Sequence, residues 1–594
     1  MDNITEEQDA IEEEQQDITA TQHHFESIIS CPKSYSTPQR LTQPNNLTDY
    51  FIYYLGKLLS YSNKKRPRPS GYWRYVLGVY KNLFLAFYFN WVVIFTSPLS
   101  SLAFILTYPI ISVLLFAFEI GLKIFMDYLG GTQLAKRISL DYGKGFGIIN
   151  WGAPHLLLSE KSCNLIKSTL TALGADDPSK SQPADDHRHR TFDVSIAQTM
   201  TILSSLVYER QDEKVSEAYK ISLEYKKTNK RQLTLEQVTL EMKKLLWDSE
   251  RPIRKIARSY GLEFSGVTEL KSLGGPFCGL FWSMDPQRPF ITVVFKGTTP
   301  TNYSEFLVDA TLQRTDARSY LFGSAHEGFY DSLFPTHSDN NDSSDPYYAI
   351  RCAVRDKAVQ LQSKSNHRTR KVPVWIAGHS LGAAMGTLLF ARWLKCPEDI
   401  GPCCKVRDAY VIGLPAVGDN DFASMFASYS NAPLSRTSTL WRIINKSDII
   451  CRIPPGYNNM TIGHYVPQTD FFNYAHVGHA VQITYALLDP NPLNIYPSSH
   501  QTNLKVDVVV SDSNVRKDRQ RQLEELKEGN KAFSPKIQEY AWWIQPWIKR
   551  VVNPIPILES LYPFFIRDHI PIDYFEGLER ARAYYKAQDM CKKD

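Results

Sequence analysis

Residues 82–118 contain no Asp, Glu, Lys or Arg, and this uncharged run restricts how the chain can fold. The run of about 37 residues is rich in Phe, Leu, Ile and Val, whereas one bilayer crossing needs about 20 such residues. Ser97 and Pro98, near its middle, predict a bend. We therefore expect a membrane-embedded helical region, either one span or a hairpin, rather than two buried helices of a soluble domain.

Composition divides the chain into four regions. Residues 1–73 form a polar tail, first acidic and then basic and rich in proline, which we expect to be disordered. Residues 74–130 hold the membrane-embedded segment, and residues 131–190 are predicted to be a linker region. Residues 191–594 are predicted to form one domain with a charged insertion at about 511–533. The net charge of +5 is too small for this length to predict a nucleic-acid-binding surface.

Predicted strands and helices alternate along this last region, which indicates an α/β fold. Short apolar runs predict strands, and apolar residues spaced three or four apart predict helices. The predicted strands are Phe277–Trp282, Phe290–Phe295, Val372–Ala377, Tyr410–Ile412 and Trp441–Ile444, with Val506–Val510 as a late one. The predicted helices are Phe192–Arg210, Leu233–Ile256 and Leu381–Lys395.

The segment around Ser380 carries the clearest chemical signal in the sequence. A predicted buried strand runs into Gly378-His379-Ser380-Leu381-Gly382, and a predicted helix follows at once. Glycines on both sides leave room for a sharp turn from which the serine hydroxyl projects. The N-terminus of the helix favours the negative charge that develops on an attacked carbonyl oxygen. We therefore predict that Ser380 is a nucleophile.

A serine nucleophile needs a base, and the base needs a carboxylate to orient it. In sheets of this type the order along the chain is Ser, Asp, His. Asp448 follows the apolar strand Trp441–Ile444 and is the best candidate acid, whereas Asp419 and Asp421 lie in a predicted turn. Spacing does not choose the base among the five histidines that follow: His464, His476, His479, His500 and His569.

Six motifs between about residues 190 and 580 together resemble the class 3 (fungal-type) lipase family, which includes triacylglycerol and sn-1-specific diacylglycerol lipases. The resemblance implies an α/β-hydrolase-type lipase domain. The motifs are the oxyanion-loop segment Phe295–Thr299, the His-x-Gly-Phe element at His326–Phe329, the nucleophile elbow Gly378–Gly382, the segment Gly413–Gly418, the acid motif at Asp448–Ile450 with Ile453–Pro455, and Asp568–His569 with Tyr574–Phe575.

The resemblance also implies the roles of single residues. It makes His569 the base, and it makes Thr298 and the backbone N–H of Leu381 the donors of the oxyanion hole. Lys296 stands where the family usually has Arg, and the spacer between Asp448 and His569 is long. The chain before residue 190 lies outside the resemblance.

In this family the stretch after the oxyanion loop is a lid. Four apolar residues of this stretch recur at the spacing of one helical face. They are Tyr303, Phe306, Leu307 and Ala310. We expect them to form a lid, although the same pattern also suits an ordinary amphipathic helix that packs on the core.

Together these features predict a membrane-attached lipase that hydrolyses the carboxylic esters of tri- or diacylglycerol. Ser380 would form an acyl-enzyme while His569 takes its proton and Asp448 orients the imidazole, and no metal or organic cofactor is required. A phospholipase or a non-lipid esterase is the alternative, because the same triad serves all acyl esters. A catalytically inactive hydrolase-like membrane scaffold is a second alternative, which the complete triad disfavours.

The charges that flank residues 82–118 predict a location. Lys64, Lys65, Arg66 and Arg68 precede the run and favour the cytosolic side of a membrane. A hairpin would return the catalytic domain to that side. We therefore expect an endoplasmic-reticulum membrane or a lipid-droplet surface as the partner of the chain, with the catalytic domain in the cytosol and a glycerolipid as substrate.

Overall fold

The computed structural model describes most of the predicted domain. The described residues are 154–175, 189–211, 235–269, 277–297, 314–334, 346–365, 370–426, 438–454, 474–485, 490–496, 505–511 and 567–591, with single positions between 91 and 124 and between 213 and 221. The predicted tail at 1–73 and the predicted charged insertion at about 511–533, apart from Ser511, lie outside the described residues.

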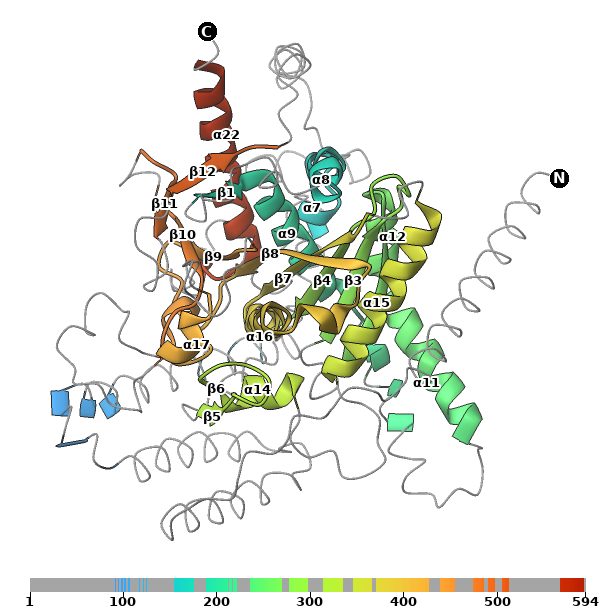
Figure 1. Ribbon diagram of the computed structural model, residues 1–594, viewed down its shortest axis with the longest axis horizontal. Helices are drawn as coiled ribbons and strands as arrows, with labels where there is room; N and C mark the ends of the chain where they lie inside the picture. The colour runs from blue at the N-terminus through green and yellow to red at the C-terminus, as the bar shows by residue number, and fades with distance from the viewer. Residues whose placement is uncertain are drawn as a thin grey trace, which may run out of the picture.

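An eight-stranded mixed sheet forms the centre of the described structure (Figure 1). Its strands are β2 (Leu262–Glu269), β3 (Phe277–Ser283), β4 (Ile291–Lys296), β7 (Val372–His379), β8 (Cys404–Ile412), β9 (Leu440–Asn445), β10 (His479–Ile483) and β11 (Leu493–Tyr496). They lie in the order β11-β10-β9-β8-β7-β4-β3-β2. Neighbours from β4 to β10 are parallel, and β2, β3 and β11 pair antiparallel.

Side chains of the central strand β7 alternate between two hydrophobic cores, one on each face of the sheet. Val372, Val374 and Ile376 belong to one core, and Trp375 and Ala377 belong to the other. A strand that is buried on both faces needs a nearly continuous apolar sequence, and this one has it. Helices must therefore cover both faces of the sheet.

Three helices cover the first face: α14 (Glu327–Leu333), α15 (Pro346–Lys364) and α16 (Leu381–Lys395). The second face carries α8 (Glu160–Leu173), α9 (Val194–Leu206), α12 (Arg251–Ser259) and α22 (Pro571–Cys591). The remaining elements are α7 (Pro154–Leu157), α11 (Leu235–Ser249), α17 (Asn420–Ser424), the hairpin of β5 (Arg314–Asp316) with β6 (Ser324–His326), the parallel pair of β1 (His189–Asp193) with β12 (Lys505–Val509), and the short 3-10 helices η2 (Val207–Glu209), η4 (Pro397–Ile400) and η5 (Ile450–Arg452).

The predicted α/β fold is confirmed, with corrections to several elements. The helix expected over Leu233–Ile256 is two helices, α11 and α12, which meet at Glu250. The Glu250 carboxylate accepts hydrogen bonds from Arg254 and from the Gly266 N–H. The late strand is present, but it pairs with β1 and not with the main sheet. Asp193 caps α9 by accepting from the N–H of Ser195 at 2.9 Å, so that helix begins after Phe192 and not at it.

Part of the segment expected to be a linker is folded against the domain. The helix α8 falls inside residues 131–190, and its Leu165, Ile166 and Leu173 are buried in the core that also holds α9. The hydroxyls of Thr169 and Thr199 lie 2.9 Å apart in the contact between the two helices. The folded unit therefore includes residues that precede the predicted boundary at 191.

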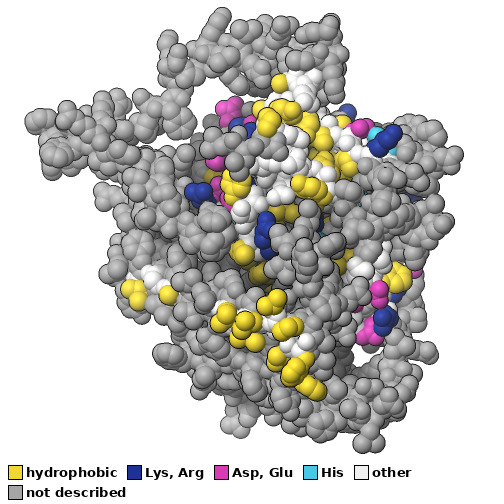
Figure 2. Space-filling model, turned by 90° about the vertical axis from the view of Figure 1, so that its left-hand side faces the viewer, with side chains coloured by type: hydrophobic (Ala, Val, Ile, Leu, Met, Phe, Trp, Pro, Cys, Tyr) yellow, Lys and Arg dark blue, Asp and Glu magenta, His cyan; other side chains and the backbone are white. Residues whose placement is uncertain are grey.

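The predicted membrane segment falls mostly outside the described residues. Within the described part of the chain, no helix combines the length and the apolar character that a membrane crossing requires. Of the described residues in the uncharged run, Trp91, Phe95 and Leu99 expose 59%, 75% and 82% of their surface. Hydrophobic side chains gather at several places on the face of the molecule drawn in Figure 2. Membrane attachment stays a prediction.

Candidate active site

Ser380 occupies the turn that joins β7 to α16. Its φ of 59° and ψ of −128° lie in a region that residues with a side chain rarely adopt. The Ser380 N–H donates to the Ile412 carbonyl at 2.9 Å, and its own carbonyl accepts from the Ala383 N–H at 2.9 Å. The neighbouring strand and the following helix thus hold the strained turn that the sequence pattern predicts.

Glycine is required on both sides of this turn. A Cβ on Gly378 would collide with the Gly382 carbonyl, and a Cβ on Gly382 would collide with the Phe295 carbonyl of β4. A Cβ on Gly297, just after β4, would lie 2.6 Å from the His379 carbonyl oxygen. The end of β4 therefore packs directly against the turn that carries Ser380.

Only one of the two predicted oxyanion donors lies in the described part of the chain. Leu381 is buried and begins α16, so its backbone N–H lies at the N-terminus of that helix. Thr298 follows Gly297 but lies outside the described residues. The predicted lid residues Tyr303, Phe306, Leu307 and Ala310 also lie outside them.

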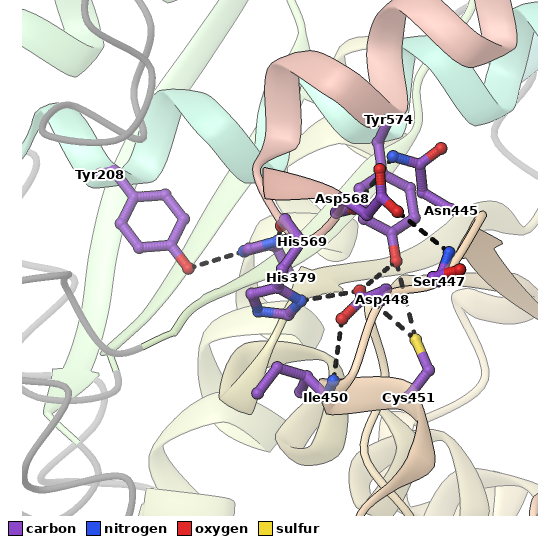
Figure 3. A network of polar contacts seen from close by, with 10 residues as sticks. All are labelled: Tyr208, His379, Asn445, Ser447, Asp448, Ile450, Cys451, Asp568, His569 and Tyr574. Carbon is purple, nitrogen blue, oxygen red and sulfur yellow. Dashed lines mark hydrogen bonds and ion pairs between the residues drawn. The ribbon is translucent and has the colours of Figure 1, made fainter. Parts of the chain in front are cut away.

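His569 and Asp448 are in direct contact although 121 residues separate them (Figure 3). The distance from His569 Nδ1 to Asp448 Oδ2 is 2.8 Å. Both side chains are buried, at 1% and 0% exposure. Asp448 lies in the loop after β9, and His569 lies just before α22. The structure thus pairs the predicted acid with the predicted base.

The Asp448 carboxylate also accepts hydrogen bonds from other groups. The Tyr574 hydroxyl donates to Oδ2 at 2.5 Å, the Ile450 N–H donates to Oδ1 at 2.9 Å, and the Cys451 thiol lies 3.5 Å from Oδ2. Burial raises the pKa of Asp448, but the charge of His569 and these hydrogen bonds lower that pKa more, to below its usual value. The carboxylate is therefore ionised at neutral pH and can accept a hydrogen bond from the Nδ1–H of His569.

The acid–base pair contacts the nucleophile elbow through His379, the residue that precedes Ser380. His379 Nε2 lies 2.8 Å from the backbone carbonyl oxygen of His569, and the two rings are 4.7 Å apart. Gly413, after β8, has a φ of 63°, and a Cβ there would lie 2.8 Å from His569 Cε1. The structure thus brings the elbow, the acid loop and the start of α22 together at one place.

Asp419, His476 and His479 have surroundings that the structure describes, whereas His464 and His500 lie outside the described residues. Asp419 accepts from the Phe422 N–H at 2.8 Å and pairs with Arg314, so it caps α17. His479 lies on β10 with its ring against Trp441. Burial lowers the pKa of His476 well below its usual value. Among the described residues, no three His, Cys, Asp or Glu side chains are grouped as a metal site would need.

Sequence reasoning missed three side chains of this network. Tyr208 binds the His379 ring, but no motif marks it, and it precedes His379 by 171 residues. His379 is the variable position of the Gly-x-Ser-x-Gly pattern and was not given a role of its own. Cys451 lies beside the acid, within a motif read only for its Asp and Pro residues.

Comparisons with known proteins give the same family for part of this region. Residues 292–458 match the model of the family described as Lipase (class 3), so the match includes the elbow and Asp448 and ends before His569. Phospholipase A1-IIgamma of Arabidopsis thaliana is 28% identical over 143 residues. That match covers 23% of this chain and 31% of the relative, so the chain spans about a third of the length of that relative.

Solved lipase structures also show similarity to the chain. One is the native Rhizomucor miehei lipase propeptide complex, with 21% identity, coverage of 44% of this chain and 67% of that chain, and a TM-score of 0.28. Another is the lipase from Rhizopus microsporus var. chinensis, with 23% identity, coverage of 43% and 71%, and a TM-score of 0.29.

Proposed function

We propose that this chain is a carboxylic ester hydrolase that acts on glycerolipids, with tri- or diacylglycerol as substrate. The match of residues 292–458 to the class 3 lipase family supports the proposal. One observation carries the proposal. A buried Asp448–His569 pair lies against the strained turn that presents Ser380. Such an arrangement of nucleophile, base and acid is typical of serine hydrolases.

In the proposed mechanism, Asp448 holds the proton of His569 on Nδ1, which leaves Nε2 as the base. His569 removes the hydroxyl proton of Ser380 while the oxygen attacks the ester carbonyl carbon. The backbone N–H of Leu381 and Thr298 bind the oxyanion. The alcohol leaves with the proton from His569, and water then releases the fatty acid from the acyl-enzyme. The segment with Tyr303, Phe306, Leu307 and Ala310 acts as the lid.

A fluorophosphonate probe and a panel of lipids test this proposal together. We expect the purified protein to be labelled at Ser380 and to release fatty acid from tri- or diacylglycerol faster than from phospholipid. An unlabelled, inactive protein would instead be a hydrolase-like membrane scaffold. Faster release from phospholipid would favour the alternative function, which the relative named phospholipase A1 supports.

Replacing Thr298 with valine is expected to lower kcat by about 100-fold, which is the usual effect of removing one oxyanion donor. The reason is that Gly297, the residue before Thr298 in the chain, packs against the elbow. Steady-state kinetics with a short soluble ester measure the effect. A change in KM with kcat unaltered would assign Thr298 to substrate positioning instead.

We also propose that residues 82–118 embed in an endoplasmic-reticulum membrane or a lipid-droplet monolayer as a hairpin. The uncharged length suits a bent hairpin, and the basic residues before it favour the cytosol. The catalytic domain would then be cytosolic, and the membrane or droplet surface would supply the glycerolipid.

Glycosylation and protease protection distinguish the hairpin from a single crossing. Four Asn-x-Ser/Thr sequences occur in the domain, at Asn302, Asn341, Asn445 and Asn459. Asn445 is fully buried and donates to the Asp568 carbonyl at 2.9 Å. Its side chain therefore cannot be glycosylated in the folded protein. We expect glycosidase to leave gel mobility unchanged and protease to digest the domain in intact microsomes. Glycosidase sensitivity with protease protection would establish a single crossing.

A further inference from the structure

A buried polar bridge of Tyr208, His379 and His569, drawn in Figure 3, connects three distant segments. His379 directly precedes the proposed nucleophile Ser380 in the chain. His379 Nε2 lies 2.8 Å from the His569 carbonyl oxygen, and His379 Nδ1 lies 3.0 Å from the Tyr208 hydroxyl. Tyr208 belongs to η2 after α9, His379 ends β7, and His569 precedes α22. The His379 side chain is completely buried.

The contacts determine which ring nitrogen of His379 carries the proton. A carbonyl oxygen can only accept, so Nε2 must donate to His569. In the neutral ring Nδ1 is then an acceptor, and the Tyr208 hydroxyl donates to it. Burial and the neighbouring His569 lower the pKa of His379 to about 3, so the ring stays neutral at working pH. The donor and acceptor roles in the bridge are therefore fixed: the Tyr208 hydroxyl donates to His379 Nδ1, and His379 Nε2–H donates to the His569 carbonyl.

Two contacts of Asp568, the residue before His569, lie on the side of the acid. Asn445 donates to the Asp568 carbonyl at 2.9 Å, and the Ser447 N–H donates to the Asp568 carboxylate at 3.1 Å. Both tie the segment before His569 to the loop that carries Asp448. The bond from His379 instead ties His569 to the residue that precedes Ser380.

The Tyr208 hydroxyl also lies beside the start of the oxyanion loop. A Cβ on Gly297 would lie 2.6 Å from this hydroxyl and 2.6 Å from the His379 carbonyl oxygen. Tyr208, His379 and Gly297 therefore pack together beneath the turn. Because the contacts of Asp568 tie this segment to the loop of Asp448, we expect a displacement of the bridge to move the base mainly relative to the nucleophile.

We propose that His379 is a positioning residue for the base: its Nε2–H holds the main chain of His569 at the distance from Ser380 that proton transfer requires, and Tyr208 orients the His379 ring. This inference rests on the proposed function. A shift of about 1 Å in a reacting group can lower a rate by about 100-fold. Losing the Nε2 donor should therefore reduce kcat and leave KM nearly unchanged.

Two substitutions of His379 separate the two halves of the bridge. In His379→Gln the side-chain amide reaches the place of Nε2 and can donate to the His569 carbonyl, whereas in His379→Asn it reaches only the place of Nδ1. We expect His379→Asn to lower kcat by about 100-fold and His379→Gln to recover at least about 10-fold of that loss. Tyr208→Phe keeps the Nε2 donor and should fall between His379→Asn and the unchanged protein.

The assay uses the full chain in detergent with a short soluble ester, and thermal melting measures the folded fraction of each variant. The inference predicts unchanged KM, an unchanged midpoint for the acid limb of the kcat/KM–pH profile, and rescue by Gln. Equal activity of the Gln and Asn variants, or a loss that follows the folded fraction, would overturn it.

If His379→Asn does not fold, the comparison of Tyr208→Phe with the unchanged protein decides, and an unaltered kcat there overturns the inference. Hydrolysis that survives Ser380→Ala would refute the proposed function itself, whereas a dead Ser380→Ala with an active His379→Asn would refute only this inference.

Discussion

Replacing Ser380 with alanine is expected to lower kcat by about a million-fold, to the level left by binding and oxyanion stabilisation alone. The substitution removes the oxygen that forms the acyl-enzyme and leaves the Asp448–His569 pair in place. Ester hydrolysis and fluorophosphonate labelling both measure the effect. Residual activity within about 100-fold of the unchanged protein would mean that another group is the nucleophile.

The same substitution should leave the fold intact. The Ser380 side chain makes no hydrogen bond that caps α16, so removing its hydroxyl leaves no donor of that helix without a partner. Alanine keeps the Cβ and thus the strain at a φ of 59°, and we expect the free energy of unfolding to change by less than about 0.5 kcal/mol. Ser380→Gly relieves that strain and should be more stable than Ser380→Ala by about 1 kcal/mol. Thermal melting compares the two inactive variants.

Residues that act as one unit do not contribute additively to a rate. A protein with both Ser380→Ala and His569→Ala should therefore be no less active than Ser380→Ala alone. A clear further drop in the double variant would contradict a mechanism in which His569 acts only by taking the proton of Ser380.

The sequence predicted the elements that have local signals. The strand before Ser380, the turn itself and the helix Leu381–Lys395 follow from residues adjacent in the chain, and the helix ends where it was predicted. The pairing of Asp448 with His569 was different, because spacing left five histidines open and a resemblance to known motifs made the choice. Periodicity describes which face of an element is buried, but it does not describe which distant elements meet.

The missed features are all long-range. The packing of α8 depends on contacts with α9, which lies on the same face of the folded sheet. The prediction of a linker over residues 131–190 rested on local composition and could not include these contacts. Tyr208 looks like any aromatic residue at the end of an apolar helix, and its hydrogen bond crosses 171 residues. At the junction of α11 and α12, the Glu250 carboxylate accepts from the Gly266 N–H of a later strand, a contact that the local sequence does not indicate.

The Asp448 carboxylate should also contribute to stability in a pH-dependent way. Its pKa in the folded protein is below the ordinary value of 3.8, so its contribution is present above that value and is lost as the pH falls through the folded pKa. The difference in unfolding free energy between the unchanged protein and Asp448→Asn should therefore be largest near neutral pH. It should shrink as the pH falls below about 4.

Asp448→Asn is expected to lower kcat by about 10,000-fold, the effect of placing an amide at the acid of a serine triad. Its Oδ1 can still accept from the Ile450 N–H, which turns the amide N–H₂ toward His569 Nδ1. Nδ1 must then accept, the ring proton moves to Nε2, and His569 loses the lone pair that takes the proton from Ser380. Steady-state kinetics on the folded variant measure the loss.

Asp419→Asn is the matched control, because it makes the same chemical change at the competing carboxylate. Asparagine caps a helix about as well as aspartate, so α17 should keep its cap while the ion pair with Arg314 is lost. The pair is largely buried, and Asp419 Oδ2 also accepts from the Ser324 N–H at 3.0 Å, so we expect a loss of stability of about 3 kcal/mol. The kcat of the folded variant should stay within about threefold of that of the unchanged protein, because these contacts of Asp419 serve α17 and the β5–β6 hairpin. If Asp419→Asn were the inactive variant and Asp448→Asn the active one, the acid would be Asp419. The contact of His569 with Asp448 would then serve only the packing of α22 against the sheet.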